Sequence, residues 1–292
     1  MVGGLGLRGR HRMSTEMTTK TLNCSANTLR LADLPTRVAA AAGAGFAGIG
    51  LRVTDYLDAN MADGEIRDLL DQHGLRVLEM EHNWDWALGE DPVEKAMFTF
   101  ADEIGIRHLN VPMFAEHPPA DLVEPFGALC DRAAAHGVLV GFEFLPYSHV
   151  RTIGEAWEVV AAADRPNGGI TVDLWHWFRS GAQPQDLAGI PASVITTVQL
   201  CDVAPEPGPD MTEEARHRRK LPGQGAGDTL TALKALRDNG MVAPVSVEVF
   251  SDELDARPPA EAARLAFDTG VKTLERAEFP APAWTTTREE AR

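Results

Sequence analysis

The sequence predicts an α/β protein that forms a single (β/α)8 TIM barrel. Three observations lead there: eight short runs rich in β-branched and aromatic residues, helix-like stretches between most of them, and glycine just past several of those stretches. The unit of helix, glycine and apolar strand recurs at roughly 30-residue spacing, as in a βα repeat. An open doubly wound sheet is the alternative, but no glycine-rich dinucleotide fingerprint follows the first strand.

The elements follow one another regularly along the chain. The expected strands are Leu22–Ser25, Ala47–Arg52, Arg76–His82, His108–Pro112, Val138–Leu145, Gly169–Trp175, Ile195–Cys201 and Val245–Phe250. The expected helices are Leu34–Ala44, Glu65–His73, Glu94–Glu103, Leu122–Ala135, Glu155–Ala163, Asp228–Asn239 and Ala260–Arg276. A left-handed cap, which favours glycine, is expected after four of these helices, at Gly74, Gly105, Gly137 and Gly240.

Two parts of the chain depart from this repeat. Val203–Gly227 is rich in turn-forming residues without a clear apolar period. It follows the seventh strand, so in a barrel it lies on the face that carries active sites. At the ends we expect a disordered leader over residues 1–19 and a Pro- and Thr-rich tail over 279–292, with the barrel in 20–278.

Composition limits the class of protein. The 292 residues are 44% hydrophobic and 24% charged, which is typical of a soluble globular protein. A net charge of −16 speaks against binding to nucleic acid or to anionic membranes. No apolar run reaches the roughly 18 residues of a membrane-spanning helix. Three widely spaced cysteines form neither a disulfide framework nor a zinc motif, which favours reduced thiols and a cytoplasmic location.

The four last strands each carry one polar residue near the end: Glu143, Asp173, Gln199 and Glu248. A buried carboxylate is unfavourable unless its charge is compensated. A single buried acid is most often a satisfied structural residue, but three acids and an amide at like positions favour one shared compensator. The carboxyl ends of barrel strands meet at one rim. Oxygen ligands suit Mg²⁺ or Mn²⁺, so the sequence predicts a divalent metal site there.

Other polar residues are candidates for contact with a substrate. His176 follows Asp173 by three positions, which carries it just past the strand end as a substrate ligand or proton donor. His82 ends the third strand and Asn110 lies in the fourth, where each could meet a hydroxyl or carbonyl group. The basic run HRRKLPGQG contains Arg219, and an arginine there could hold a hydroxyl, carboxylate or phosphate.

Several segments together resemble the xylose isomerase-like barrel superfamily, which includes the sugar phosphate isomerase/epimerase family and the endonuclease IV-like group. The segments are GFEFLP, PNGGITVDLWHWFRSG, VQLCD, RKLPGQG and SVEVF. The resemblance implies that Glu143, Asp173, Gln199 and Glu248 bind the metal. It also implies that His176 and Arg219 contact the substrate. The DNA-repair branch needs a histidine-rich three-metal site, and the net charge and the few histidines at strand ends disfavour it.

The resemblance implies a Mn²⁺- or Mg²⁺-dependent isomerase or epimerase that acts on a sugar or cyclitol hydroxy-ketone. It would work by proton abstraction and a metal-stabilised enediolate, with Glu143 and Glu248 as base and acid and His176 as a third catalytic candidate. Many family members carry histidine where this chain has Gln199. The glutamine form is similar to that of some 3-dehydroshikimate dehydratases, so a lyase of that type is the alternative.

Two further expectations complete the prediction. A barrel that binds a ligand or partner without catalysis is a third possibility, which the placement of two acids and a histidine disfavours. The expected partner is a small hydroxy-ketone substrate, with neither nucleic acid nor membrane. A homodimer is expected because such barrels often associate through their outer helices.

Overall fold

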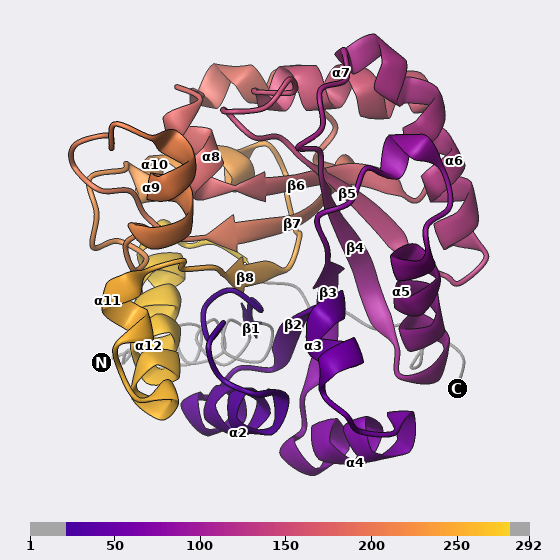
Figure 1. Ribbon diagram of the computed structural model, residues 1–292. Coiled ribbons are helices and arrows are strands. Elements are labelled where there is room, and N and C mark those ends of the chain that lie inside the picture. The colour runs from indigo at the N-terminus through magenta and orange to yellow at the C-terminus, as the bar shows by residue number, and fades with distance from the viewer. Residues whose placement is uncertain (1–21, 281–292) are drawn as a thin grey trace, which may run out of the picture.

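The structure is a computed structural model that describes residues 22–280 (Figure 1). The expected leader and most of the expected C-terminal tail lie outside the described residues. Between these limits the chain alternates strands and helices, as the sequence predicts.

Eight parallel strands close into a barrel in chain order, and β1 pairs with both β2 and β8. Every expected strand is present, and no strand end differs from its predicted position by more than three residues. The strands are β1 Leu22–Cys24, β2 Gly48–Arg52, β3 Arg76–Glu81, β4 Ile106–Pro112, β5 Leu139–Glu143, β6 Gly168–Asp173, β7 Ile195–Leu200 and β8 Val245–Val247. The predicted single (β/α)8 TIM barrel is therefore confirmed.

All seven expected helices are present and surround the barrel (Figure 1). They are α2 Leu34–Ala44, α4 Asp63–His73, α5 Pro92–Glu103, α6 Val123–Ala134, α7 Ile153–Ala163, α10 Thr229–Asp238 and α12 Pro259–Ala277. The four glycines predicted to cap helices have φ between 66° and 96°, the left-handed region that other residues rarely adopt. Helix ends were predictable because glycine has a distinct role there.

Short helices and 3₁₀ turns between the main elements were not predicted. They are α3 Val53–Asp58, α8 Leu174–Arg179, α9 Met211–His217 and α11 Asp252–Asp255, together with the 3₁₀ turns η1 Trp86–Leu88, η2 Pro119–Leu122, η3 Pro184–Leu187 and η4 Ala192–Val194. Helices this short carry too few apolar positions to show a period.

Two of the short helices correct the sequence prediction. The sixth strand was expected to reach Trp175, which is wrong: the Asp173 carboxylate accepts hydrogen bonds from the backbone N–H groups of Trp175 and His176 and so begins α8. Helix α9 lies within the segment 203–227 that was expected to be irregular, and Asp210 caps it in the same way. Both helices turn side chains back toward the barrel mouth.

The barrel interior is polar, whereas barrels of this type usually fill it with branched apolar side chains. Asn23, Glu79 and Ser246 are fully buried and hydrogen-bond to one another across β1, β3 and β8. A side chain at Gly50 would come within 2.8 Å of the Glu79 carboxylate, so this glycine makes room for the acid. The apolar core lies instead between strands and helices, where Trp86, Phe126 and Phe142 pack together.

Within residues 22–280, no helix combines the length and apolar character that crossing a membrane requires.

Candidate metal and active site

A cavity of about 430 Å³ lies at the barrel mouth, where the carboxyl ends of the strands meet. The side chains around it come from nearly every part of the barrel. Among them are Glu81, His82, Glu143, His176, Arg219 and Glu248. Three of the four residues predicted to contact substrate therefore line the cavity: His82, His176 and Arg219.

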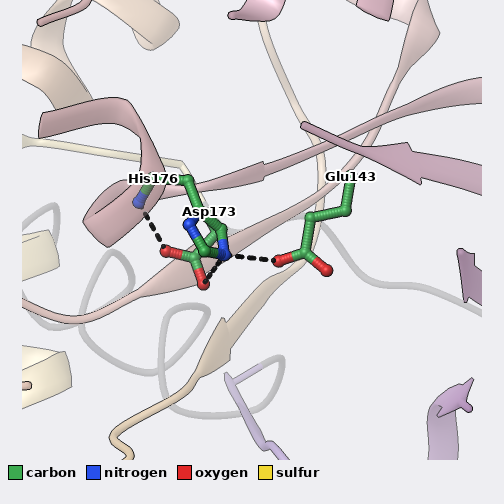
Figure 2. Close-up of side chains that lie close together, drawn as sticks. All are labelled: Glu143, Asp173 and His176. Carbon is green, nitrogen blue, oxygen red and sulfur yellow. Dashed lines mark hydrogen bonds and ion pairs between the residues drawn. The ribbon is translucent and has the colours of Figure 1, made fainter. Parts of the chain in front are cut away.

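Glu143, Asp173 and His176 form a compact group beside the cavity (Figure 2). Glu143 ends β5, Asp173 ends β6, and the cap that Asp173 provides places His176 in the first turn of α8. The His176 Nε2 atom is 3.3 Å from Glu143 Oε1 and 3.9 Å from Asp173 Oδ2. One potential ligand atom of each residue lies within 4.8 Å of the others, close enough to hold one metal ion.

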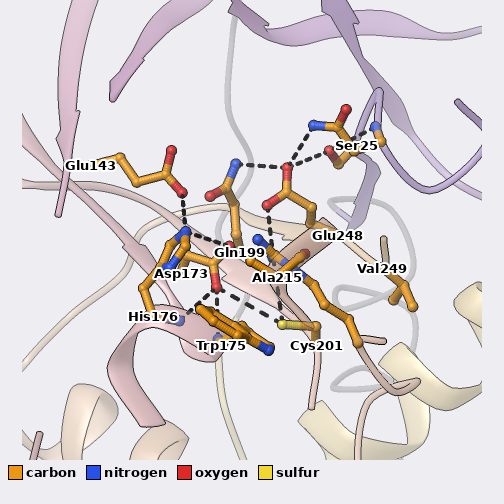
Figure 3. Close-up of polar contacts among 12 residues, drawn as sticks. Ser25, Glu143, Asp173, Trp175, His176, Gln199, Cys201, Ala215, Glu248 and Val249 are labelled. Carbon is orange, nitrogen blue, oxygen red and sulfur yellow. Dashed lines mark hydrogen bonds and ion pairs between the residues drawn. The ribbon is translucent and has the colours of Figure 1, made fainter. Parts of the chain in front are cut away.

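Gln199 and Glu248 stand next to this group (Figure 3). The Gln199 Nε2 group donates a hydrogen bond to Glu248 Oε1 at 3.2 Å. The amide oxygen, Oε1, is buried and has no hydrogen-bond partner among the described residues. A buried acceptor left unpaired costs free energy. A cation that binds this oxygen would remove that cost, so Gln199 fits the role of a neutral metal ligand.

Arg219 is buried at the base of the cavity, with 3% of its surface exposed. Its Nη1 atom donates to Asp173 Oδ2 at 2.5 Å and to Glu248 Oε2 at 3.1 Å. Its Nε group donates to the carbonyl of Ala215. The arginine therefore supplies part of the positive charge that the sequence assigned to a metal alone.

Of the arginines among the described residues, only Arg219 forms ion pairs with the acids that gather here. Five carboxyl groups lie at or beneath the cavity: Glu79, Glu81, Glu143, Asp173 and Glu248. Burial raises the pKa of Glu79 to about 7 and that of Glu81 to about 8. Burial also raises the pKa of Glu248 well above its usual value, against the opposing effect of Arg219. The site therefore has room for further positive charge.

Asp173 differs from these acids. Burial disfavours its charged form, but Arg219 and His176 overcome this and lower the pKa of Asp173 to about 2. It is thus an ionised carboxylate at neutral pH, as a metal ligand must be. The donor set of carboxylates, an unpaired amide oxygen and an imidazole fits a divalent cation.

The first half of the barrel supplies hydrogen-bond donors to Glu248 and Glu143, from the turn after β1 and from β4. Ser25 Oγ donates to Glu248 Oε1 at 2.8 Å, and Asn27 Nδ2 donates to the same atom at 3.2 Å. Asn110 Nδ2 donates to Glu143 Oε2 at 2.9 Å. Asn110 was predicted to contact substrate; in the structure it is fully buried and holds Glu143.

Sequence reasoning missed Glu79 and Glu81. Both lie in β3, whose sequence RVLEME places two acids two positions apart, on the same face of an otherwise apolar strand. That alternation was a usable signal, because an acid directed into a barrel interior needs a partner. Asn27 was also missed; it lies in the turn after β1, where sequence gives no such signal.

Comparisons with known proteins point to one family. The model of a family described as xylose isomerase-like TIM barrel matches residues 38–270. A curated 3-dehydroshikimate dehydratase of Pseudomonas aeruginosa is 32% identical over 238 residues, which cover 77% of this chain and 37% of that protein. A curated inosose isomerase of Halalkalibacterium halodurans is 33% identical over 148 residues, covering 50% of this chain and 51% of that protein. The chain thus spans little more than a third of the first relative and about half of the second.

A solved structure described as IolI protein with a binding zinc atom has the same fold. Its TM-score is 0.79 at 22% identity, and the match covers 88% of this chain and 99% of that chain. At this identity the likeness concerns the fold alone.

Proposed function

Because the chain belongs to the xylose isomerase-like TIM barrel family, we propose that it is a divalent-metal-dependent enzyme that removes a proton next to the carbonyl of a hydroxy-ketone. On this proposal it isomerises or epimerises a sugar or cyclitol. The observation that supports it is a cluster of carboxyl groups around buried Arg219 at the mouth of the barrel. A purely structural site would balance its charges within the protein.

The metal would be held by Glu143, Asp173, Gln199 and Glu248, with His176 adjacent to the first two. Mn²⁺ and Mg²⁺ suit the oxygen donors, and elemental analysis of the purified protein decides between them and zinc, which the similar IolI structure contains. When bound, such an ion supplies a Lewis acid for the carbonyl and neighbouring hydroxyl oxygens of a substrate.

The protein's own groups then carry the proton chemistry. Glu143 and Glu248 line the cavity from β5 and from the end of β8, so one can take the proton from carbon and the other can return it. His176 Nε2, 3.3 Å from Glu143, can orient that carboxylate or exchange a proton with it. His82 and Arg219 face the cavity and would hold substrate oxygens.

A lyase of the 3-dehydroshikimate dehydratase type is the second candidate. Gln199 favours it, because the glutamine at this position is similar to that of some such dehydratases. The relative with that name also matches a longer stretch of this chain than the inosose isomerase does, 238 residues against 148. Both reactions begin with the same proton removal, and they differ in where the next proton goes.

Proton exchange tests this proposal. The protein is incubated in D₂O with Mn²⁺ or Mg²⁺ and a panel of ketoses, an inosose and 3-dehydroshikimate, and NMR follows loss of the hydrogen next to the carbonyl. We expect this hydrogen to exchange with solvent and EDTA to abolish the exchange. If the protein is a lyase, 3-dehydroshikimate should also give aromatic absorbance. An absence of exchange for every compound, with no metal in the protein, would overturn the proposal.

A small-molecule partner, a cytoplasmic location and a homodimer are part of the same proposal. Gel filtration with light scattering measures the last of these.

A further inference from the structure

Glu81 is the last residue of β3, and its side chain lines the cavity. The Asn27 Nδ2 group donates to Glu81 Oε1 at 2.6 Å and also to Glu248 Oε1 at 3.2 Å. One amide therefore joins Glu81 to a carboxylate to which we assign proton transfer. Glu81 is thus part of the site and not of the surrounding scaffold.

The neighbouring strand connects Glu81 to Glu143 as well. Glu81 lies opposite Asn110 in the β3–β4 register, and Asn110 donates to Glu143 at 2.9 Å. Burial raises the pKa of Glu81, with Glu79 and Glu143 adding to the effect, while Arg52 and Asn110 act in the opposite direction. Glu81 is therefore linked to Glu248 through the Asn27 amide and lies opposite the residue that holds Glu143.

Glu81 also differs from those two carboxylates in its bonding. Each Glu248 carboxylate oxygen has at least one donor, including Arg219, and His176 stands beside Glu143. Within residues 22–280, no basic side chain forms an ion pair with Glu81. A cavity-lining acid that forms no ion pair can hold a proton and give it up.

A metal-bound site gains a proton donor from such a group. A carboxylate must be deprotonated to bind a metal ion, so Glu143 and Glu248 lose their protons when they serve as ligands. Either can then act as the base, but neither enters the reaction with a proton of its own. Glu81 lies outside the proposed ligand set and does not have this restriction.

We propose that Glu81 is a further catalytic residue that delivers the second proton of the reaction, the one the product gains after the base has removed the first. This inference rests on the proposed function. It assigns the acid role to Glu81 in place of a metal-holding carboxylate.

The step balances for either reaction. In an epimerisation, the base takes the proton from carbon and Glu81 returns one to the opposite face of the same carbon. In an elimination, the bond from carbon to the β-hydroxyl breaks with its electron pair on oxygen. That oxygen takes the Glu81 proton and leaves as water. In both, Glu81 ends as a carboxylate, the base ends protonated, and a proton returns through solvent.

Two rates measured on one sample test the assignment: exchange of the substrate hydrogen into D₂O, which needs only the base, and formation of product, which needs both protons. The probes are 3-dehydroshikimate and an inosose, and the variants are Glu81→Gln, Glu81→Asp and the control Glu158→Gln. Glu158 is exposed on α7, away from the cavity lining. For Glu81→Gln we expect exchange within about threefold of the unsubstituted protein and product formation lower by about 10²- to 10³-fold.

The conservative variant sharpens this result. Glu81→Asp keeps the acid but shortens its reach, so product formation should fall less than in Glu81→Gln while exchange persists. A melting curve shows whether Glu81→Gln folds. If it does not, Glu81→Asp alone tests the assignment. Glu158→Gln should match the unsubstituted protein in both rates.

Three outcomes overturn the assignment. Equal loss of exchange and product in Glu81→Gln would mean that Glu81 shapes the site, and unchanged rates would mean that it has no role. If His176→Gln shows the separation of rates and Glu81→Gln does not, the histidine is the acid. In each of these cases the proposed function survives, whereas absence of exchange in the unsubstituted protein removes both.

Discussion

The two halves of the barrel contribute different things to the site. The second half, β5 to β8, brings the charged groups: Glu143, Asp173 and Glu248, with Arg219 in the loop after β7. The first half, β1 to β4 and the turns after them, brings neutral donors to those charges: Ser25 and Asn27 to Glu248, and Asn110 to Glu143. Such donors orient a buried carboxylate and favour its ionised form.

Two residues of the first half do not fit this division, because they are acids and not neutral donors. Glu79 and Glu81 are acids from the first half, and burial raises the pKa of both. The acid from the second half that pairs most closely with Arg219, Asp173, has a pKa near 2 instead. Asp173 therefore favours bound charge, whereas burial raises the pKa of Glu248 in the second half as it raises those of the two acids in the first half.

The largest effect should come from the charged half. Replacing Glu248 with glutamine removes a proposed ligand and base, so we expect the metal-dependent exchange rate to fall at least about 10³-fold. The free energy of unfolding without metal should stay the same or rise, because burial disfavours the Glu248 charge. Exchange measured by NMR and urea unfolding of the same preparation check both parts.

Glu158→Gln serves as the control for removal of a negative charge, since that side chain is exposed on α7. A Glu248→Gln variant that loses stability and activity together would show a structural carboxylate, and the division between the halves would then not hold for β8.

The charged half was also the half that sequence could predict. In β5 to β8 a single polar residue stands out from each apolar run, and the predicted strand ends placed Glu143, Asp173, Gln199 and Glu248 at one rim. Parallel strand order and barrel closure follow from the repeat of helix, glycine and strand. These features are local in sequence, so pattern alone gives them.

The rest depends on contacts between residues far apart in the chain. Arg219 reaches Asp173, 46 positions earlier, through a loop with no apolar period, so sequence suggested a substrate contact and not a buried ion pair. Ser25 reaches Glu248 across 223 positions because barrel closure brings β1 beside β8. Only the fold shows which neutral residues hold which carboxylates.

An intermediate effect should come from the donor half. Removing the Asn110 amide with Asn110→Ala leaves Glu143 Oε2 without its 2.9 Å donor, and loss of such supporting contacts typically costs about 10- to 100-fold in metal affinity or activity. Titration with Mn²⁺, followed by electron paramagnetic resonance, measures the affinity. Ser25→Ala should cost less, because Glu248 Oε1 keeps the Asn27 and Gln199 donors. If Ser25→Ala costs more than Asn110→Ala, the number of remaining donors does not set the effect.

The smallest effect should be on how the free energy of unfolding of the metal-free protein depends on pH. It concerns the acids that keep a proton in the folded state. Burial raises the pKa of Glu81 to about 8 and that of Glu248 well above its usual value, so both keep protons in the folded state that the unfolded chain has already lost. Above the usual carboxyl pKa, the metal-free protein should therefore lose stability as pH rises, by about 1.4 kcal/mol per pH unit for each such group. The loss should end as pH passes the folded-state values.

Buried His108 has a lowered pKa and opposes this trend only below its usual value of 6.5, so unfolding by urea between pH 6.5 and 8 isolates the acids. Excess Mn²⁺ should reverse the slope, because metal binding displaces those protons and tightens as they leave. Stability that rises with pH in EDTA would mean that the carboxyl groups are already compensated within the protein. The case for a cation at this barrel mouth would then lose its electrostatic basis.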